Sequence, residues 1–160
     1  MVKVTGARVT AAVACAAFAC VGCLGCSAAP PPGGFPEEPM MTVMSQNAAY
    51  RIEIRTSPQP PTRGDQGVEF TIASAATGAP ATKLAIHVVP WMPIMLHGTS
   101  IQPTVTETKP GVYLVSDVDL FMSGEWQLRT TIDTSDGATV PASQGTSAPT
   151  DHVGPIFQIP

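Results

Sequence analysis

The sequence predicts an all-β domain, an immunoglobulin-like antiparallel β-sandwich of about seven strands. From Ala48 onward apolar residues alternate with polar ones, as in Tyr50, Ile52 and Ile54, and this period of two is typical of half-buried strands. Turn signals rich in Gly and Pro separate these runs, and no stretch after the N-terminal segment has the apolar period of a helix. A small closed β-barrel is the alternative.

The expected strands follow one another at intervals of roughly 10 to 20 residues. Turns with Gly or Pro bound them, such as Gly64 before the second strand and Pro110-Gly111 before the fifth. Pro90 is expected to end the third strand, because proline has no N–H to give to a sheet. The strands are expected over residues 50–55, 68–72, 84–88, 104–106, 112–118, 126–132 and 153–159, with a long loop over 142–151.

The first residues have the features of a secretory signal. Lys3 and Arg8 form a cationic start, the run from Val9 to Leu24 is almost entirely small or apolar, and prolines at 30–32 end any helical pattern. A membrane-spanning helix is the alternative, but the run falls short of the roughly 20 strongly apolar residues needed. The signal is therefore assigned to residues 1–26, and the domain is expected to be exported.

All four cysteines lie within or at the end of this signal, so no disulfide is expected in the rest of the chain. They are Cys15, Cys20, Cys23 and Cys26. Leu24-Gly25-Cys26-Ser27 resembles the lipobox of bacterial lipoproteins, whose cysteine is lipidated and becomes the new N-terminus. Cys26 is the predicted lipidation site and Cys23 the alternative; ordinary cleavage after Ala29 would place Pro30 directly behind the cut. Lipidation predicts a membrane-anchored lipoprotein of the cell envelope, facing the periplasm or the surface.

Residues 27–47 consist largely of Pro, Gly, Ser, Ala, Glu and Met and cannot form a core. They are expected to be a flexible tether for the domain of residues 48–160. Met40, Met41 and Met44 lie in this segment. Such residues could collect metal ions as a mobile arm, although a first strand or an adhesive linker is their commoner role.

The charge of the exported part argues against nucleic acid as a partner. Loss of Lys3 and Arg8 with the signal leaves six basic residues against 12 acidic ones, a net charge of about −6. The chain has no basic stripe, no aromatic platform and no Gly-rich phosphate loop. The expected partners are the membrane, through the N-terminal lipid, and a protein of the envelope.

Soft ligand atoms gather in Trp91-Met92-Pro93-Ile94-Met95-Leu96-His97-Gly98. Met95 and His97 are two residues apart, so an extended backbone would point both side chains the same way, with Met92 pointing opposite unless Pro93 bends the loop. Met122 lies in a later loop that a sandwich can bring to the same end. Thioethers and an imidazole suit Cu(I), which makes Met95, His97, Met122 and, as an auxiliary ligand, Met92 a candidate metal site. The competing interpretation is a packed loop in which sulfur lies against tryptophan.

Catalysis is not expected. The exported part has no cysteine nucleophile and no Gly-x-Ser-x-Gly elbow, and Asp117 and Asp119 have no acid or base partner at a telling spacing. A zinc site is also not expected, because neither an HxxxH spacing nor a carboxylate cluster accompanies His97. The sequence thus favours a binding role, with or without copper.

Three segments resemble the YtkA-like family of small exported or lipid-anchored bacterial β-sandwiches, which is similar to FixH-like and copper-handling modules. The family pattern is a Met-Pro-x-Met-x-His-Gly loop, a Gly-x-Tyr strand and a Met-x-Gly-x-Trp turn. It matches residues 92–98, 111–113 and 122–126 here, and the resemblance covers roughly residues 50–133. Leu96 stands where Gly is usual and is expected to crowd the loop, and Ser123 stands where Pro is frequent. The resemblance implies copper handling or assistance in assembling a respiratory enzyme.

Overall fold

A computed structural model of the chain describes residues 34–133 and 150–160. In these two ranges the chain forms ten strands and no helix, which confirms the all-β prediction. The strands are β1 (Met41–Met44), β2 (Tyr50–Ser57), β3 (Gly64–Ser74), β4 (Ala85–Met92), β5 (His97–Gly98), β6 (Thr104–Lys109), β7 (Val112–Leu120), β8 (Gly124–Asp133), β9 (Thr150–Val153) and β10 (Ile156–Ile159).

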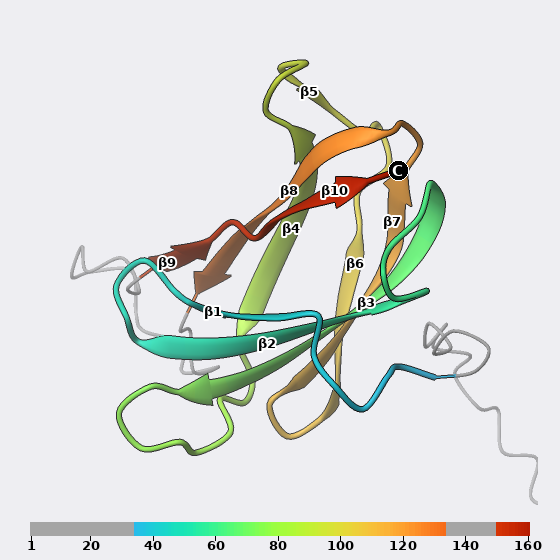
Figure 1. The fold of residues 1–160 in the computed structure, drawn as a ribbon. Coiled ribbons are helices and arrows are strands. Elements are labelled where there is room, and N and C mark those ends of the chain that lie inside the picture. Colours follow the sequence, from blue (N-terminus) through green and yellow to red (C-terminus); the bar gives the residue numbers. More distant parts are fainter. Residues whose placement is uncertain (1–33, 134–149) are drawn as a thin grey trace, which may run out of the picture.

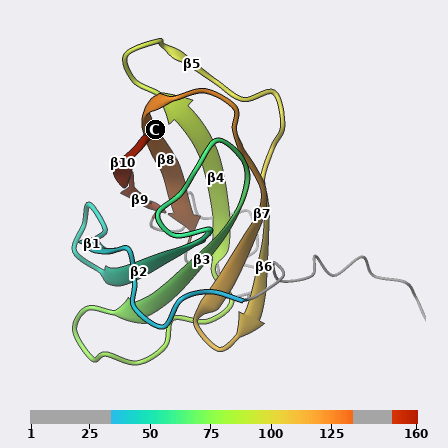
Figure 2. The same cartoon turned by 45° about the vertical axis from the view of Figure 1, so that its right-hand side comes forward.

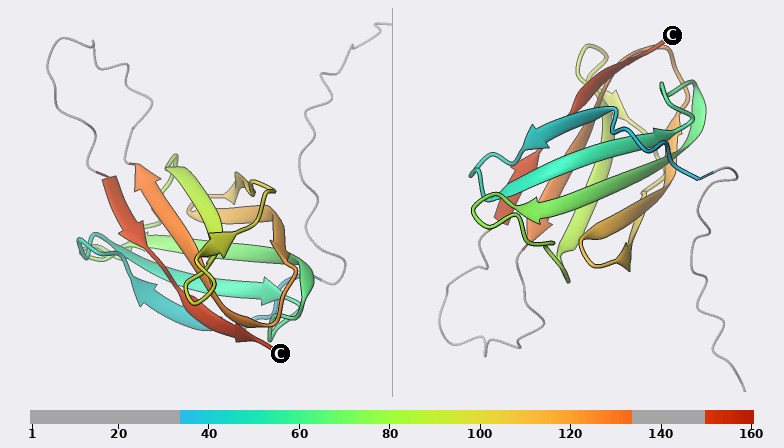
Figure 3. Two further views of the ribbon diagram at one scale, coloured as in Figure 1. Left: turned by 90° about the horizontal axis from the view of Figure 1, so that it is seen from above. Right: turned by 60° about the horizontal axis from the view of Figure 1, so that its bottom comes forward.

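The strands form two antiparallel sheets packed face to face (Figures 1 and 3). One sheet has the order β1-β2-β3-β7-β6, and the other has the order β10-β8-β4-β5, with β9 also paired to β8. Without β1 and β5, four strands face three in the order that defines the constant-type immunoglobulin sandwich. The predicted immunoglobulin-like sandwich is therefore confirmed, and the barrel alternative is not.

Every predicted strand is present, but the last one is interrupted. Val153 of β9 pairs with Thr130 and Ile156 of β10 pairs with Gln127, so the two strands keep one register along β8. Gly154 and Pro155 separate them, because proline cannot donate to the ladder. The Pro155 carbonyl still accepts the backbone N–H of Leu128 at 3.0 Å.

Strand β1 lies within residues 27–47, which were assigned to the tether with a first strand kept as an alternative for its methionines. Met41 to Met44 pairs antiparallel with β2, and Met41 and Val43 pack against the core while the residues between and after them face solvent. The predicted boundary at residue 47 is thus too late: at least from Met41 the chain belongs to the sandwich. The alternation of Met41 and Val43 with polar or exposed neighbours is a strand pattern too short to stand out in a Pro-rich segment.

The expectation that Pro90 ends its strand was wrong. β4 continues through Pro90 to Met92, and Pro90 pairs with Leu128 of β8. On its other side β4 pairs with β5 only at Trp91 and Met92, so Pro90 lies where that side of the strand has no partner. A proline is tolerated at such an edge position because no ladder hydrogen bond is lost there.

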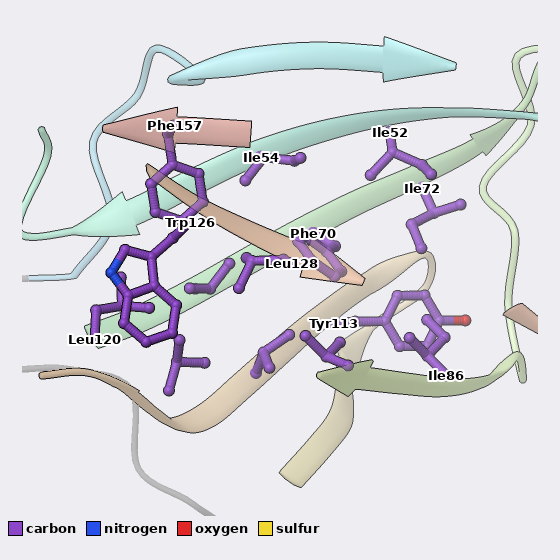
Figure 4. Packing of buried hydrophobic residues seen from close by; sticks show 14 of the residues in the cluster. Ile52, Ile54, Phe70, Ile72, Ile86, Tyr113, Leu120, Trp126, Leu128 and Phe157 are labelled. Carbon is purple, nitrogen blue, oxygen red and sulfur yellow. The ribbon is translucent and has the colours of Figure 1, made fainter. Parts of the chain in front are cut away.

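The core lies between the sheets, and its largest fully buried side chains are Trp126, Tyr113 and Phe70 (Figure 4). Isoleucine, leucine and valine from both sheets fill the space around these rings. Burial of each such side chain contributes roughly 1.5–3 kcal/mol, which explains how the sandwich is stabilised without a disulfide.

Asp151 joins the β1–β2 turn to β9 on one side of the sandwich. Its Oδ1 accepts the backbone N–H of Asn47 at 2.9 Å and that of His152 at 2.8 Å, and the Gln46 N–H donates to the His152 carbonyl at 2.7 Å. Burial by itself raises the pKa of Asp151, but the Ser45 hydroxyl and the two N–H groups together outweigh it and lower the pKa. The contact therefore depends on an ionised carboxylate.

The predicted signal peptide, Cys26 and its alternative Cys23, and nearly all of the predicted loop over 142–151 lie outside the described residues. Across residues 34–133 and 150–160, no helix has the length and apolar character to cross a membrane.

Candidate functional site

The predicted ligands lie at one end of the sandwich, here called the hairpin end and defined as residues 92–98 and 121–124. The β4–β5 hairpin projects from this end, and the β7–β8 turn lies beside its base (Figures 1 and 2). A sheet-to-sheet crossover between β7 and β8 brings the second segment there. The expectation that the fold places the Met122 loop near the His97 loop is met at the level of the backbone.

The hairpin closes through a tight turn over residues 93–96. The Leu96 N–H donates to the Met92 carbonyl at 2.9 Å, and Leu96 has a φ of 55°, in the left-handed region. This conformation explains why glycine is usual at this position, since a side chain there costs roughly 1–2 kcal/mol. The leucine side chain itself is 76% exposed, so it points to solvent and does not crowd the loop as expected.

The turn changes which side chains share a face. Met92 and His97 are directly opposed cross-strand partners, and such residues project to the same side of a sheet. The backbone between Met95 and His97 is not extended, so the premise that made Met95 the natural companion of His97 was wrong. Pro93 does bend the chain after Met92, which is the condition under which Met92 joins the other ligands.

His97 is half-buried and lies against Phe121. The two ring centroids are 6.0 Å apart with an interplanar angle of 24°, and Phe121 in turn meets Trp126 edge-on at 5.6 Å. The His97 Nδ1 lies 3.3 Å from the carbonyl oxygen of Gly98. Because a carbonyl only accepts, this contact is a hydrogen bond when Nδ1 carries the proton, and the lone pair is then left on Nε2, the atom that would bind a metal.

The Met92 thioether is the inner member of the group. Met92 is 3% exposed, and its Cε packs on the backbone of Gly124, where an added β-carbon would lie only 3.1 Å away. Gly124 has a φ of 128°, a second reason for glycine at that turn. The half-buried Met122 packs on the same core, and its carbonyl accepts the Trp126 indole N–H at 2.9 Å. The Met-x-Gly-x-Trp pattern therefore builds the floor of the hairpin end.

Met95 occupies a different place from the other three predicted ligands. It lies at the tip of the hairpin and is 53% exposed, between Ile94 and Leu96, which are also exposed. The structure thus brings Met92 and His97 together as cross-strand partners beside the turn that contains Met122 and Gly124, and it leaves Met95 at the exposed tip of the hairpin.

Two glycines of the family pattern have steric explanations. A β-carbon at Gly98 would lie 2.5 Å from the Pro90 carbonyl oxygen, and one at Gly111 would lie 2.8 Å from the Ile72 carbonyl oxygen. Ser123, at the other departure from the pattern, donates its hydroxyl to the Pro160 carbonyl at 2.7 Å and ties the β7–β8 turn to the end of β10. These positions shape the sandwich and carry no ligand atoms.

Sequence reasoning did not identify Phe121 or Gly124 as parts of the site. Phe121 is the residue on which His97 stacks, and Gly124 is the surface on which Met92 packs. Both residues lie within two positions of Met122 in the sequence, and this was the one indication that they could belong to the site. That they face the hairpin follows only from the folded structure. Among the described residues there is no group of three or more His, Cys, Asp or Glu side chains that could hold a metal ion, so any metal here would depend on thioethers.

Comparison with known proteins gives one assignment. No curated protein and no solved structure matches the chain significantly. A family model described as YtkA-like matches residues 30–131, which is more than half of the chain and takes in β1 to β7 and most of β8. The chain therefore belongs to the YtkA-like family.

Proposed function

We propose that this protein is a lipid-anchored β-sandwich of the cell envelope that binds Cu(I), or assists metal delivery to a partner, at its hairpin end. Its ligands are Met92, His97 and Met122, with the exposed Met95 available to complete the site. The anchor is a lipid on Cys26, with the domain facing the periplasm or the cell surface. The role is binding and transfer, without catalysis.

One observation carries the proposal: the cross-strand pairing of Met92 with His97 beside the turn that holds Met122. It combines two neutral thioethers with an imidazole whose Nδ1 faces a carbonyl oxygen. Such a set favours a soft monovalent ion over zinc, calcium or magnesium. Thioethers also resist the disulfide formation that would disable thiol ligands in an oxidising compartment.

The difference in exposure between Met95 and Met92 suggests how an ion would move. Met95 is 53% exposed at the hairpin tip and Met92 is 3% exposed, and His97, directly opposite Met92, has intermediate exposure. An incoming ion would meet Met95 first, and its transfer inward to His97 and Met92 would shield it from water. Release to a partner would reverse the order.

The test is a Cu(I) titration of the metal-free protein against a chromogenic Cu(I) chelator under anaerobic conditions. Met92→Leu and Met122→Leu remove a sulfur while keeping volume, and each is expected to weaken binding at least about tenfold, as is His97→Gln. Met44→Leu is the matched control, because Met44 is a 49% exposed methionine in β1, outside the hairpin end. Its affinity should equal that of the wild type.

Cu(I) binding that persists unchanged in a Met95→Ala, His97→Ala double variant would show that the hairpin does not hold the ion. Binding lost equally in Met44→Leu would point to nonspecific thioether chemistry. Far-ultraviolet circular dichroism of each variant separates lost ligands from lost folding.

A second candidate function is a metal-free protein-interaction module. The observation that favours it is the exposure of large apolar side chains at the hairpin tip, where Ile94 is 75% and Leu96 76% exposed, with Phe121 45% exposed nearby. Exposed apolar clusters of this kind mark protein contacts. Metal analysis of the protein isolated from membranes, compared with co-purification of partners by wild type and an Ile94→Ser, Leu96→Ser variant, discriminates the two functions.

A further inference from the structure

Away from the hairpin end, an open groove of about 620 Å³ runs between β1 and the strands β8 and β9. Val43 and Met44 form one wall, and Val153 and Pro155 form part of the other. The hydrogen bond from the Gln46 N–H to the His152 carbonyl joins the turn after β1 to β9 at one point of the groove. A groove of this volume accommodates a small ligand or a few residues of a peptide.

The charge of this groove is opposite to that of the rest of the chain. The full sequence has 12 acidic and 8 basic residues, yet none of the described residues lining the groove is an aspartate or glutamate, and Arg129 lines it. His152 and the amides of Gln46 and Gln127 are further polar groups on its surface. The groove is therefore suited to an anion with hydrogen-bond acceptors.

Arg129 is held in place without a carboxylate. Its guanidinium carbon lies 4.1 Å from the centre of the Trp91 ring, and its Nε donates to the Gln127 Oε1 at 3.2 Å. No ion pair within 4.0 Å joins Arg129 to an acidic side chain in the described ranges. The stacked guanidinium thus keeps its terminal amino groups for an external acceptor, and this fork matches a carboxylate in geometry.

Gly154 leaves the space that the Gln127 side chain occupies on the polar side of the groove. A β-carbon there would lie 2.5 Å from the Gln127 Nε2, which donates to the Gly154 carbonyl at 3.3 Å. Gln127 therefore lies across the backbone of Gly154 and presents its Oε1 to Arg129. Gly154, Gln127 and Arg129 line the groove together with the residues of its apolar wall.

We propose that this groove binds a carboxylate that carries an apolar chain, with the carboxylate on Arg129 and the chain along Val43, Met44, Val153 and Pro155. We take the C-terminus of a peptide with apolar residues as the source of this carboxylate, because the side-chain amides of Gln46 and Gln127 line the groove and can hydrogen-bond a peptide backbone. The site is separate from the hairpin end and does not depend on the proposed metal.

The experiment is isothermal titration of the full chain, in a neutral detergent, with hexanoate and with hexanamide, which has the same apolar chain without the charge. An acetylated Ala-Val-Leu tripeptide and its C-terminal amide form the second pair. Each acid is expected to bind at least about tenfold more tightly than its amide. The tripeptide acid is expected to bind more tightly than hexanoate, and tighter binding of hexanoate would overturn the assignment to a peptide terminus in favour of a fatty acid.

Arg129→Gln should weaken binding of the acids at least about tenfold and leave the amides unchanged, whereas Arg129→Lys should retain part of the affinity. Arg63→Gln is the control, because Arg63 is an exposed cation that does not line the groove. Thermal unfolding of each variant checks that the sandwich is intact. Acid and amide bound equally, affinity unaffected by Arg129→Gln, or no binding of either acid at about 10 mM would overturn the proposal.

Discussion

The two ends of the sandwich are built in different ways, although both contain parts of the family pattern. At the hairpin end, large apolar side chains and a half-buried imidazole face outward around a few hydrogen bonds. At the opposite end, here called the turn end and defined as residues 81–84 and 107–113, polar groups of the β3–β4 connection and the β6–β7 turn are bonded to one another. Figure 1 shows the β6–β7 turn of this end far from the β4–β5 hairpin.

Tyr113 and Glu107 hold the turn end together. The Tyr113 hydroxyl donates to the Ala81 carbonyl at 2.8 Å and accepts the Leu84 N–H at 3.2 Å. The Glu107 carboxylate accepts the N–H groups of Gly111 at 3.0 Å and Lys83 at 2.9 Å, and these bonds lower its pKa. The comparison teaches that the Gly-x-Tyr element is structural, whereas the Met-Pro-x-Met-x-His-Gly element is left available for contact.

The largest effect is expected for Tyr113→Ala at the turn end. Loss of a fully buried ring, together with its two hydrogen bonds, should lower the free energy of unfolding by about 3–5 kcal/mol. Tyr113→Phe keeps the ring and should cost about 1–3 kcal/mol. Urea unfolding measures both. A loss below about 1 kcal/mol for Tyr113→Ala would contradict the structural role of this end.

A smaller effect is expected for Gly98→Ala, which tests the hairpin end as a scaffold. The added methyl group would meet the Pro90 carbonyl at 2.5 Å, so the hairpin must shift at a cost of about 1–3 kcal/mol. The Cu(I) titration should then show weaker binding, because His97 moves with the hairpin. Unchanged stability and affinity would show that the hairpin is loosely attached.

Asp151→Asn tests the contact between the β1–β2 turn and β9, and the expected loss at neutral pH is about 1–3 kcal/mol. The pKa of Asp151 in the folded chain lies below its ordinary value of 3.8. A lowered pKa means that the carboxylate stabilises the fold fully above about pH 3.8, and that this contribution is lost as the pH falls through the folded-state pKa. The difference in urea midpoint between wild type and variant should therefore shrink in acid. A constant difference at every pH would exclude ionisation as the cause.

The smallest effect is a gain of stability. Leu96→Gly relieves the left-handed backbone at the hairpin tip and should raise the free energy of unfolding by up to about 1 kcal/mol, partly offset by the greater entropy of glycine in the unfolded chain. Because the leucine side chain is exposed, Cu(I) affinity should not change. If affinity rose markedly, the leucine would be crowding the site after all. Thermal unfolding and the chelator titration provide the two readouts.

Much of the architecture was predictable because strand periodicity is a local property. Tyr50, Ile52 and Ile54 alternate with charged residues, and this suffices to place a strand and choose its buried face. The strand at Met41–Met44 was only one of several alternatives for a tether segment, and the continuation of β4 through Pro90 was missed, because both depend on which neighbouring strands are present. A four-residue strand and an edge proline have no distinctive local pattern.

The candidate site was predictable in composition but not in arrangement. Met92, Met95, His97 and Met122 were identified from their side-chain chemistry alone. Their division into a buried group and an exposed tip follows from a turn that begins after Met92 and from the position of Gly124 on another strand. No spacing rule within one segment contains that information.

The amino-acid sequence by itself determined the all-β class, the positions of the main strands along the chain and the chemical kinds of ligand. Alternation, turn residues and side-chain type are properties of a few neighbouring residues. Only the tertiary structure decided that Met92 faces His97, that Phe121 supports the imidazole and that Arg129, which lines a groove without carboxylates, stacks on Trp91. Such contacts join strands far apart in the chain, so they exist only once the two sheets have packed together.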